Sequence, residues 1–416
     1  MSNIKNFFIN KMVLAIIGGL ALVTLSACVM SPNNASTTSA PSETDAAACV
    51  PSKAPRQELI LDFGSSYAAE LTEQVFDTES SVYYLCREDN EQEVIYISDK
   101  EYKDWMPLCG RPNCMHDDEN CDAWLEGSTL GCKIWPFDEH IYYLIDNNKQ
   151  SDSVYELWRM KLDGTEHEMA LECRNLSAHD DPSARMTSWF FHGRYAILTF
   201  SEMSEDSVER SCSVIDLSKK PLEQVPLDLP IWAFKIYAGD GDIVYGVDPM
   251  ENNSLYSIDL LSQTTRKLCE LPFYPDFSGC QLIDSVLYFS GGIETGMLAS
   301  FDTVTEKLTV FENTLPVGYW YTMHAGFIIA TDVPLEGEKR GTMIYDLEGN
   351  LIRAIPYSEY GTDIMVSRAA GNLIFGADCS NGDLSEISYN SPPEYYIDLS
   401  QIGAEGFGWM KWGSEL

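Results

Sequence analysis

Apolar and polar positions alternate in short runs along most of the chain, and residues 242–271 show the pattern most clearly. An apolar run with an aromatic residue at 243–245 gives way to a polar turn. A second alternating run follows at 255–260 and a third at 267–271. Runs of about five or six residues with a period of two, separated by Asn, Asp, Ser and Gly, predict an antiparallel β-meander.

The same pattern recurs along the chain as a repeat. Apolar, tyrosine-rich leading runs begin at Val82, Ile141, Tyr195, Ile243, Val286, Phe327 and Leu373. Partner runs begin near positions 94, 157, 212, 255, 298 and 343, and a further run follows the partner at 307, 351 and 395. An aromatic element precedes several leading runs, at 135–137, 189–191, 232–234 and 319–321. One such unit cannot bury its own face, so successive copies must pack on one another.

Four strands and about 40–50 residues per unit are the dimensions of a propeller blade. We therefore predict an all-β fold, a single β-propeller over residues 57–416. About 51 residues per unit favour seven four-stranded blades, with six or eight as alternatives. A pair of two-sheet sandwiches fits seven similar units poorly. The lone apolar run at 59–63 is expected to pair with the last blade as its outer strand and so to close the ring.

The first residues have the pattern of a secretory signal peptide, residues 1–27. Lys5 and Lys11 precede a short apolar core at 12–23, and small residues follow it. The sequence LSAC at 25–28 resembles the bacterial lipobox, which implies cleavage before Cys28 and diacylation of its thiol. An ordinary transmembrane anchor is the alternative, but the core is shorter than the ~20 residues that span a bilayer.

The next segment, residues 28–56, is rich in Ser, Thr, Ala and Pro and is expected to be a disordered tether. The whole chain has a formal net charge of −37, which becomes −39 when Lys5 and Lys11 leave with the signal peptide. A negative charge of this size repels phosphate backbones and argues against nucleic acid as a partner. We expect a monomer that lies outside the cytoplasm and is held to the cell membrane by lipid.

The repeated units resemble the low-density-lipoprotein-receptor-type and quinoprotein-like propellers. The whole chain, with its lipobox, tether and repeats, resembles uncharacterised surface lipoproteins of Gram-positive anaerobes. The units carry neither a strict YWTD tetrapeptide nor a clean tryptophan-docking motif. The resemblance therefore implies a fold and an envelope location, and it transfers no ligand.

One segment, residues 108–124, interrupts the repeat and is expected to be a loop between the first two blades. It carries four side chains of metal-ligand type in the spacing C-x4-C-x-H-x4-C, namely Cys109, Cys114, His116 and Cys121. Three thiolates and an imidazole are the ligand set of a closed tetrahedral zinc site, whose role would be structural. Thiols outside the membrane are normally oxidised, so disulfides that include Cys132 are one alternative and free thiols another.

The remaining cysteines and the acidic residues have simpler interpretations. Most of the scattered cysteines lie within or beside apolar runs and are expected to be small buried side chains: Cys86, Cys173, Cys212, Cys269, Cys280 and Cys379. Aspartates lie mostly in turns, which their side chains support. The turn at 240–242 is acidic enough to attract calcium but does not match an EF-hand loop. We find no hydrolase or zincin motif in the sequence.

The sequence favours a ligand-binding module over an enzyme. Tryptophans of the aromatic elements and of the C-terminal segment are expected to converge near the central channel: Trp135, Trp189, Trp232, Trp320, Trp409 and Trp412. Flat aromatic faces beside carboxylates suit the rings of a glycan, and a peptide fits as well. For each ring, packing between blades is the alternative. A protein-interaction scaffold in an envelope assembly is the alternative function, and a hydrolase or lyase is a further one.

Overall fold

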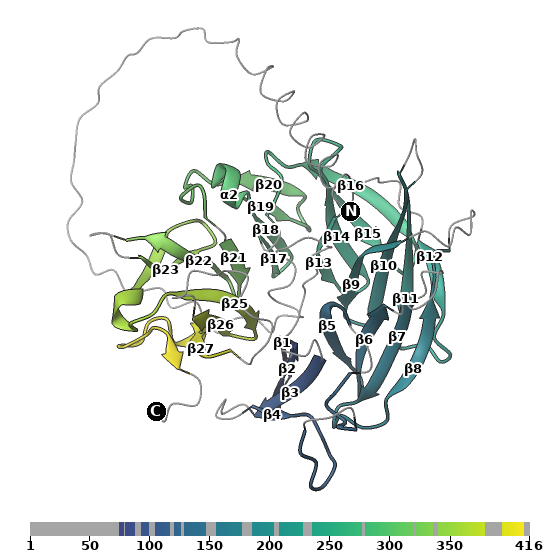
Figure 1. The fold of residues 1–416 in the computed structure, drawn as a ribbon. Coiled ribbons are helices and arrows are strands. Elements are labelled where there is room, and N and C mark those ends of the chain that lie inside the picture. The colour runs from purple at the N-terminus through teal and green to yellow at the C-terminus, as the bar shows by residue number, and fades with distance from the viewer. Residues whose placement is uncertain are drawn as a thin grey trace, which may run out of the picture. The chain divides into compact units, whose positions relative to one another are not determined.

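The structure is a computed structural model, and it forms a ring of seven antiparallel sheets with four strands each (Figure 1). It describes residues 75–78, 80–87, 93–99, 105–116, 120–125, 129–146, 155–176, 185–203, 208–227, 235–276, 279–319, 321–335, 340–378 and 393–411. The prediction of an all-β propeller with seven four-stranded blades is thereby confirmed. The predicted signal peptide, lipidated Cys28, tether and strand at 59–63 lie outside the described residues. Within those residues, no helix is long and apolar enough to cross a membrane.

The first four blades take their strands from the chain in order. Blade 1 contains β1 (Val75–Asp77), β2 (Ser81–Arg87), β3 (Glu93–Asp99) and β4 (Met106–Pro107). Blade 2 contains β5 (Thr129–Phe137), β6 (His140–Asp146), β7 (Tyr155–Lys161) and β8 (Glu168–Cys173). Blade 3 contains β9 (Arg185–His192), β10 (Tyr195–Met203), β11 (Val208–Asp216) and β12 (Gln224–Leu227). Blade 4 contains β13 (Lys235–Asp240), β14 (Ile243–Asp248), β15 (Ser254–Asp259) and β16 (Thr264–Glu270).

The last three blades follow the same plan. Blade 5 contains β17 (Cys280–Ile283), β18 (Val286–Ser290), β19 (Leu298–Asp302) and β20 (Lys307–Val310), with the short helix α2 (Gly292–Thr295) before β19. Blade 6 contains β21 (Tyr321–His324), β22 (Phe327–Pro334), β23 (Arg340–Asp346) and β24 (Leu351–Pro356), followed by the 3-10 turn η2 (Tyr357–Glu359). Blade 7 contains β25 (Ile364–Ala370), β26 (Leu373–Asp378), β27 (Tyr395–Asp398) and β28 (Met410–Lys411), with η4 (Leu399–Gln401) between its last two strands.

The seven leading runs form the second strand of each blade, as predicted. The first strands lie innermost, because those of neighbouring blades contact one another: β1 contacts β5, β13 contacts β17, and β17 contacts β21. Contact between β1 and β25 closes the ring between the first and the last blade. One assignment from the sequence needs correction. The run at 395 forms β27, which pairs directly with β26 and therefore takes the partner position, and the short β28 lies outside it.

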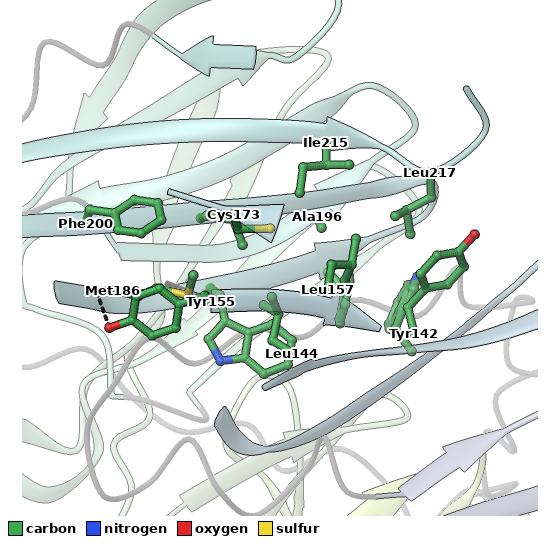
Figure 2. Close-up of a cluster of buried hydrophobic side chains, with 14 residues drawn as sticks. Tyr142, Leu144, Tyr155, Leu157, Cys173, Met186, Ala196, Phe200, Ile215 and Leu217 are labelled. Carbon is green, nitrogen blue, oxygen red and sulfur yellow. Dashed lines mark hydrogen bonds between the residues drawn. The ribbon is translucent and has the colours of Figure 1, made fainter. Parts of the chain in front are cut away.

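Seven clusters of buried hydrophobic side chains fill the seven boundaries between blades. They arise because successive residues of a strand face opposite sides of the sheet. In β9, Trp189 and Phe191 pack against blade 2, whereas Phe190 between them packs against blade 4. Figure 2 shows the cluster between blades 2 and 3, where the backbone N–H of Met186 donates to the hydroxyl of Tyr155 at 2.9 Å. Burial of these side chains therefore stabilises the contact between neighbouring blades.

Hydrogen bonds cross several of these boundaries at equivalent places. A side chain within the last three residues of one blade's first strand bonds the glycine of the next blade's first turn. The pairs are Trp135 Nε1 with the Gly193 carbonyl (2.9 Å), His192 Nε2 with the Gly241 carbonyl (3.0 Å), Gln281 Oε1 with the Gly326 N–H (3.0 Å) and His324 Nε2 with the Gly371 carbonyl (2.9 Å). Neighbouring blades are thus fixed in register by polar contacts as well as by packing.

An aspartate ends the third strand in blades 3 to 7, and in blade 2 it follows that strand by two residues; in each blade it supports the turn to the outer strand. In each case a carboxylate oxygen accepts a hydrogen bond from the backbone N–H two residues later, and the six residues are Asp163, Asp216, Asp259, Asp302, Asp346 and Asp398. Such a side chain replaces a backbone acceptor in the turn. The expectation that aspartates serve the turns is confirmed at these six positions.

Candidate metal centre

The segment at residues 108–124, called the Cys/His loop from here on, is an insertion in the outer strand of blade 1. Ile95 of β3 accepts a hydrogen bond from the N–H of Leu108 (2.8 Å) and donates its own N–H to the carbonyl of Ala123 (2.9 Å). Beyond this point Val94 pairs with Trp124. The chain therefore leaves the strand after Leu108 and rejoins it at Ala123. Along the chain the loop lies between β4 of blade 1 and β5 of blade 2, as predicted, and these hydrogen bonds add that both of its ends are attached to blade 1.

The four predicted ligands converge within this loop. One ligand atom from each of Cys109, Cys114, His116 and Cys121 lies within 4.8 Å of all the others. The Nδ1 atom of His116 is 3.3 Å from the sulfur of Cys121. Ligands at zinc–sulfur distances of about 2.3 Å would lie about 3.8 Å apart at the corners of a tetrahedron. The cluster therefore has the composition and the compactness of a four-ligand metal site.

Backbone geometry brings the ligands together. His116 has a φ of 59°, and Asn113, which precedes the second cysteine, has a φ of 61°. These left-handed conformations turn the chain sharply on both sides of Cys114. The hydrophobic part of the loop is anchored, because Cys109, Cys114 and the buried Cys121 pack against the cluster between blades 1 and 2. A loop without a core of its own is thus held on the core of the propeller.

Two backbone donors surround the first ligand. Burial opposes ionisation of Cys109, but hydrogen bonds from the backbone N–H groups of Arg111 and Asp122, together with those from the Cys121 and Cys114 thiols, outweigh it and lower the pKa of this thiol. The same two residues form an ion pair through their side chains, with 2.6 Å between Arg111 Nε and a carboxylate oxygen of Asp122. Donors of this kind stabilise a thiolate and orient it for a metal.

The third cysteine, Cys121, is instead stabilised as the neutral thiol. The pKa of Cys121 is raised to about 12, chiefly by burial and also by the nearby Cys109 and Cys114, although the backbone N–H of Ala123 opposes the rise. Three sulfurs so close together cannot all carry a negative charge without a compensating cation. A divalent metal ion would supply that charge and displace the remaining protons.

The chemistry that this set supports is structural. All four corners of a tetrahedron would be occupied by protein ligands, so that no position remains for a substrate or a reactive water. The cysteines that the structure describes are all free thiols. The side chain of Cys132, which the disulfide alternative requires, lies outside the described part of the chain.

The predicted ring of tryptophans is placed only in part. Trp135, Trp189 and Trp409 are buried between blades, with 8%, 4% and 4% of their surface exposed. The indole of Trp135 stacks on Phe191 at a centroid distance of 5.7 Å. The indole N–H of Trp409 donates to the Thr342 hydroxyl at 3.1 Å. These three rings serve the packing between blades. The other three, Trp232, Trp320 and Trp412, lie outside the described residues.

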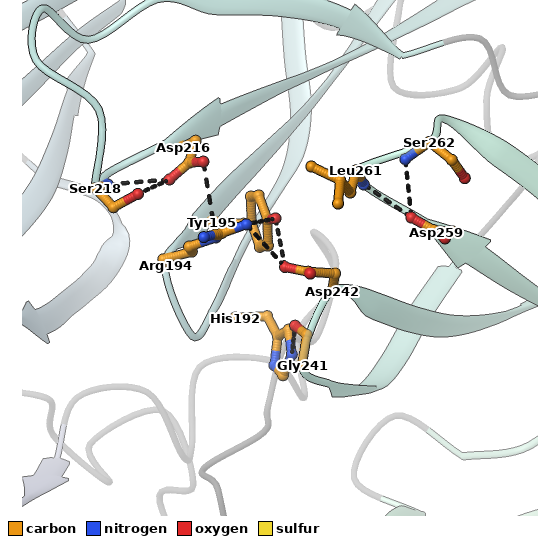
Figure 3. A network of polar contacts seen from close by, with 10 residues as sticks. All are labelled: His192, Arg194, Tyr195, Asp216, Ser218, Gly241, Asp242, Asp259, Leu261 and Ser262. Atoms are coloured by element: carbon orange, nitrogen blue, oxygen red, sulfur yellow. Dashed lines mark hydrogen bonds and ion pairs between the residues drawn. The ribbon is translucent and has the colours of Figure 1, made fainter.

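The acidic turn at 240–242 belongs to a polar network between blades 3 and 4 (Figure 3). The hydroxyl of Tyr195 donates to a carboxylate oxygen of Asp242 at 2.6 Å. The guanidinium of Arg194 lies 2.7 Å from that hydroxyl, 3.1 Å from Asp242 and 3.7 Å from Asp216. These partners engage Asp242, so the carboxylate acts here as an element of the blade boundary.

Sequence reasoning found the ligands but missed the residues that support them. Arg111 and Asp122 act on Cys109 mainly through their backbone N–H groups, and a backbone donor has no signature in the side-chain sequence. Of the scattered cysteines, Cys86, Cys173, Cys212 and Cys280 are buried as predicted, Cys269 is half-buried, and Cys379 lies outside the described residues. Burial raises the pKa of Cys173 to about 12, which keeps this thiol protonated and inert.

Fold and site together define a seven-bladed β-propeller with a four-ligand Cys/His loop in its first blade. No protein-family model matches the chain, and no curated protein matches it. Among solved structures, it is similar to a puromycin hydrolase, with 12% identity and a TM-score of 0.46 over 80% of this chain and 52% of that one. TolB from Acinetobacter baumannii matches with 13% identity and a TM-score of 0.37 over 66% of this chain and 63% of its own.

A further likeness is to a chain of a mitotic checkpoint complex, with 12% identity and a TM-score of 0.41 over 84% of this chain and 96% of that one. The chain spans less than two thirds of the puromycin hydrolase and TolB chains, and 32% of the tricorn protease chain that it also matches. Identities this low support no inference about activity or partners. Membership of the lipoprotein group that the sequence resembles stays a prediction.

Proposed function

We propose that the protein is a lipid-anchored, extracytoplasmic propeller that serves as a binding or scaffolding module, and that its Cys/His loop holds a structural zinc ion. The convergence of Cys109, Cys114, His116 and Cys121 carries the second part. Three sulfurs and one imidazole in a closed set favour zinc over harder cations, which prefer oxygen ligands. The ion would fasten the two ends of an insertion that interrupts the outer strand of blade 1.

Metal content and free thiols of the purified full-length chain test the zinc site. We expect one zinc per chain, lost when Cys114→Ser and His116→Ala are combined. Cys269→Ser is a matched control, because this half-buried cysteine lies on β16, away from the loop. Absence of zinc together with a disulfide in the region 109–132 would contradict the proposal and make the loop a covalent staple.

A scaffold that binds other proteins is favoured over a module that stacks glycans on tryptophan. The supporting observation is that Trp135, Trp189 and Trp409 lie inside the packing between blades and offer no free face. Large apolar side chains are exposed instead at the outer strands and turns of several blades, including Val304 in blade 5 and Leu351 and Ile352 in blade 6. The two alternatives are separated by measuring glycan and protein binding of one surface variant, Leu351→Lys with Ile352→Lys. If the protein is a scaffold, this variant should lose protein binding. Glycan binding by the wild type would favour the glycan-binding module instead.

The membrane anchor is tested separately. Cys28→Ser removes the thiol that the lipid would modify, so we expect the chain to move from the membrane fraction to the soluble fraction. Replacement of Cys49, which lies in the same predicted tether, controls for the loss of any cysteine. If the Cys28 variant remains in the membrane fraction, the lipid anchor is refuted.

A further inference from the structure

The turn that joins β7 to β8 in blade 2 lies against the base of the Cys/His loop. Gly164 in this turn has a φ of +83°, and a Cβ atom there would lie 2.2 Å from the carbonyl oxygen of Leu108. Only glycine fits so close an approach. In addition, the hydroxyl of Tyr83 in β2 donates to the carbonyl of Leu162 at 3.3 Å. Blade 1 thus contacts this turn through the residue at which its loop begins and through a second, independent bond.

His167, at the end of the same turn, reaches the other end of the loop. Its Nε2 lies 2.9 Å from the carbonyl oxygen of Asp122 and 3.0 Å from that of Gly164. Because both partners are acceptors, Nε2 carries the proton and donates to them. Its Nδ1 then accepts from the hydroxyl of Tyr143, 3.2 Å away, on a side chain that is buried in β6. The orientation of the imidazole is therefore fixed from both sides.

Asp122 connects this histidine to the metal ligands. Its backbone N–H is one of the two donors to the sulfur of Cys109, and its side chain pairs with Arg111, whose N–H is the other donor. A hydrogen bond to the carbonyl of Asp122 restrains the backbone that carries this donor. The contacts run without interruption from the core of blade 2, through His167 and Asp122, to the first ligand.

From these contacts we infer that His167 is a positioning residue for the metal site, and that metal binding by the loop is coupled to the docking of the β7–β8 turn on blade 1. The inference rests on the proposed zinc site. Coupling of this kind is reciprocal. A metal ion that orders the loop strengthens the contact between blades 1 and 2, and a weakened contact lowers the affinity for the metal by the same factor.

Zinc affinity of the full-length chain, measured by competition with a zinc chelator, gives the first test. Outer-shell hydrogen-bonding partners contribute about 10–100-fold to metal affinity. His167 acts through one intervening residue, so we expect His167→Ala to raise the zinc dissociation constant about tenfold. Tyr143→Phe, which keeps the buried ring and removes only the hydroxyl, should raise it by a smaller factor. His167→Gln retains an N–H donor and should restore most of the affinity. His140→Ala, in the same blade, is the matched control and should leave it unchanged.

Thermal unfolding with zinc and with chelator separates coupling from a purely structural role. Coupling predicts that zinc raises the Tm less in His167→Ala than in the wild type, and that the difference vanishes when Cys114→Ser is present in both chains. An equal zinc-induced rise in the two chains, or an unchanged dissociation constant in His167→Ala, would overturn the inference while leaving the zinc site standing. A wild-type chain that binds no zinc would remove the site itself, and the coupling with it.

Discussion

Arg111 and Asp122 form an ion pair across the base of the Cys/His loop, with 2.6 Å between Nε and the carboxylate oxygen. The arginine side chain is 55% exposed and the aspartate side chain 11%, so solvent screens the pair on one side only. Their backbone N–H groups both donate to Cys109. The ion pair therefore links the two residues whose backbone N–H groups donate to Cys109. Its contribution can be measured through the zinc affinity of the site.

Arg111→Ala keeps the backbone N–H and removes the ion pair. Exposed pairs contribute about 0–1 kcal/mol, so the zinc dissociation constant should rise by up to about fivefold. The effect should shrink in 1 M salt, because counterions already weaken the pair in the wild type. Chelator competition at low and high salt measures both. A ratio between variant and wild type that is the same at both salt concentrations would show that charge is not the cause.

Deleting residues 109–123 joins Leu108 directly to Trp124. In the present chain the N–H of Leu108 and the carbonyl of Ala123, on either side of the insertion, bond Ile95. Without the insertion, the N–H and the carbonyl of Leu108 would together supply both of these hydrogen bonds. We expect a folded propeller that unfolds in one cooperative transition at a lower Tm and binds no zinc. Circular dichroism and thermal unfolding check this, with the Cys114→Ser, His116→Ala chain as the comparison that keeps the loop. A deletion variant without cooperative unfolding would mean that the loop is essential to blade 1.

Stability should fall in acid through His324. Burial lowers the pKa of this imidazole from 6.5 to about 4, although its hydrogen bond to the Gly371 carbonyl opposes the shift. Between these two values the unfolded chain binds a proton that the folded chain does not. The stabilisation that comes from the uncharged, buried imidazole is therefore complete above pH 6.5 and is lost as the pH falls towards 4. The total loss in the free energy of unfolding is about 3 kcal/mol.

His324→Gln retains a donor for Gly371 and does not titrate. Unfolding free energies measured from pH 7 to pH 4 should converge for wild type and variant as the pH falls, because only the wild type loses this contribution. Carboxylates titrate in the same range, but they do so in both chains and cancel in the difference. Parallel curves would be evidence that His324 is not desolvated as the structure indicates.

Tyr195→Phe removes the hydroxyl that lies between Arg194 and Asp242 (Figure 3). Burial, followed by the hydrogen bond to Asp242, raises the pKa of Tyr195 to about 12, which keeps the hydroxyl protonated as a donor at neutral pH. Hydrogen bonds to charged groups contribute about 1.5–3 kcal/mol, so denaturant unfolding should show a loss of this order. In the background of Asp242→Asn the same substitution should cost less. Equal losses in the two backgrounds would mean that the pair does not interact.

The strand order of the propeller could be predicted from the sequence because it is encoded locally. Alternation and tyrosine-rich runs mark the second strand of every blade, and aspartates mark the turns to the outer strands in blades 2 to 7. Outer strands were harder to predict, because β4 and β28 have only two residues each. The run at 395 was assigned to the wrong position for this reason, since the chain makes the η4 turn before the true outer strand begins.

The four ligands could also be predicted, because thiols and imidazole at short spacing are a local signal. The attachment of both ends of their loop to blade 1 could not be predicted, because it depends on Ile95 bonding both Leu108 and Ala123. The role of the tryptophans was equally ambiguous. An aromatic side chain on a strand suits a ligand face and a blade boundary alike, and only the alternation within β9 shows which neighbour Trp189 contacts.

Every described blade is built from strands that follow one another along the chain, and the contact between β1 and β25 joins segments roughly 290 residues apart. Low contact order favours rapid formation of the individual hairpins and of neighbouring blade pairs. Closure is different, because it must bring the two distant ends of an otherwise finished arc together. We therefore expect the cluster that contains Tyr84 and Phe375 to be the last to assemble during folding.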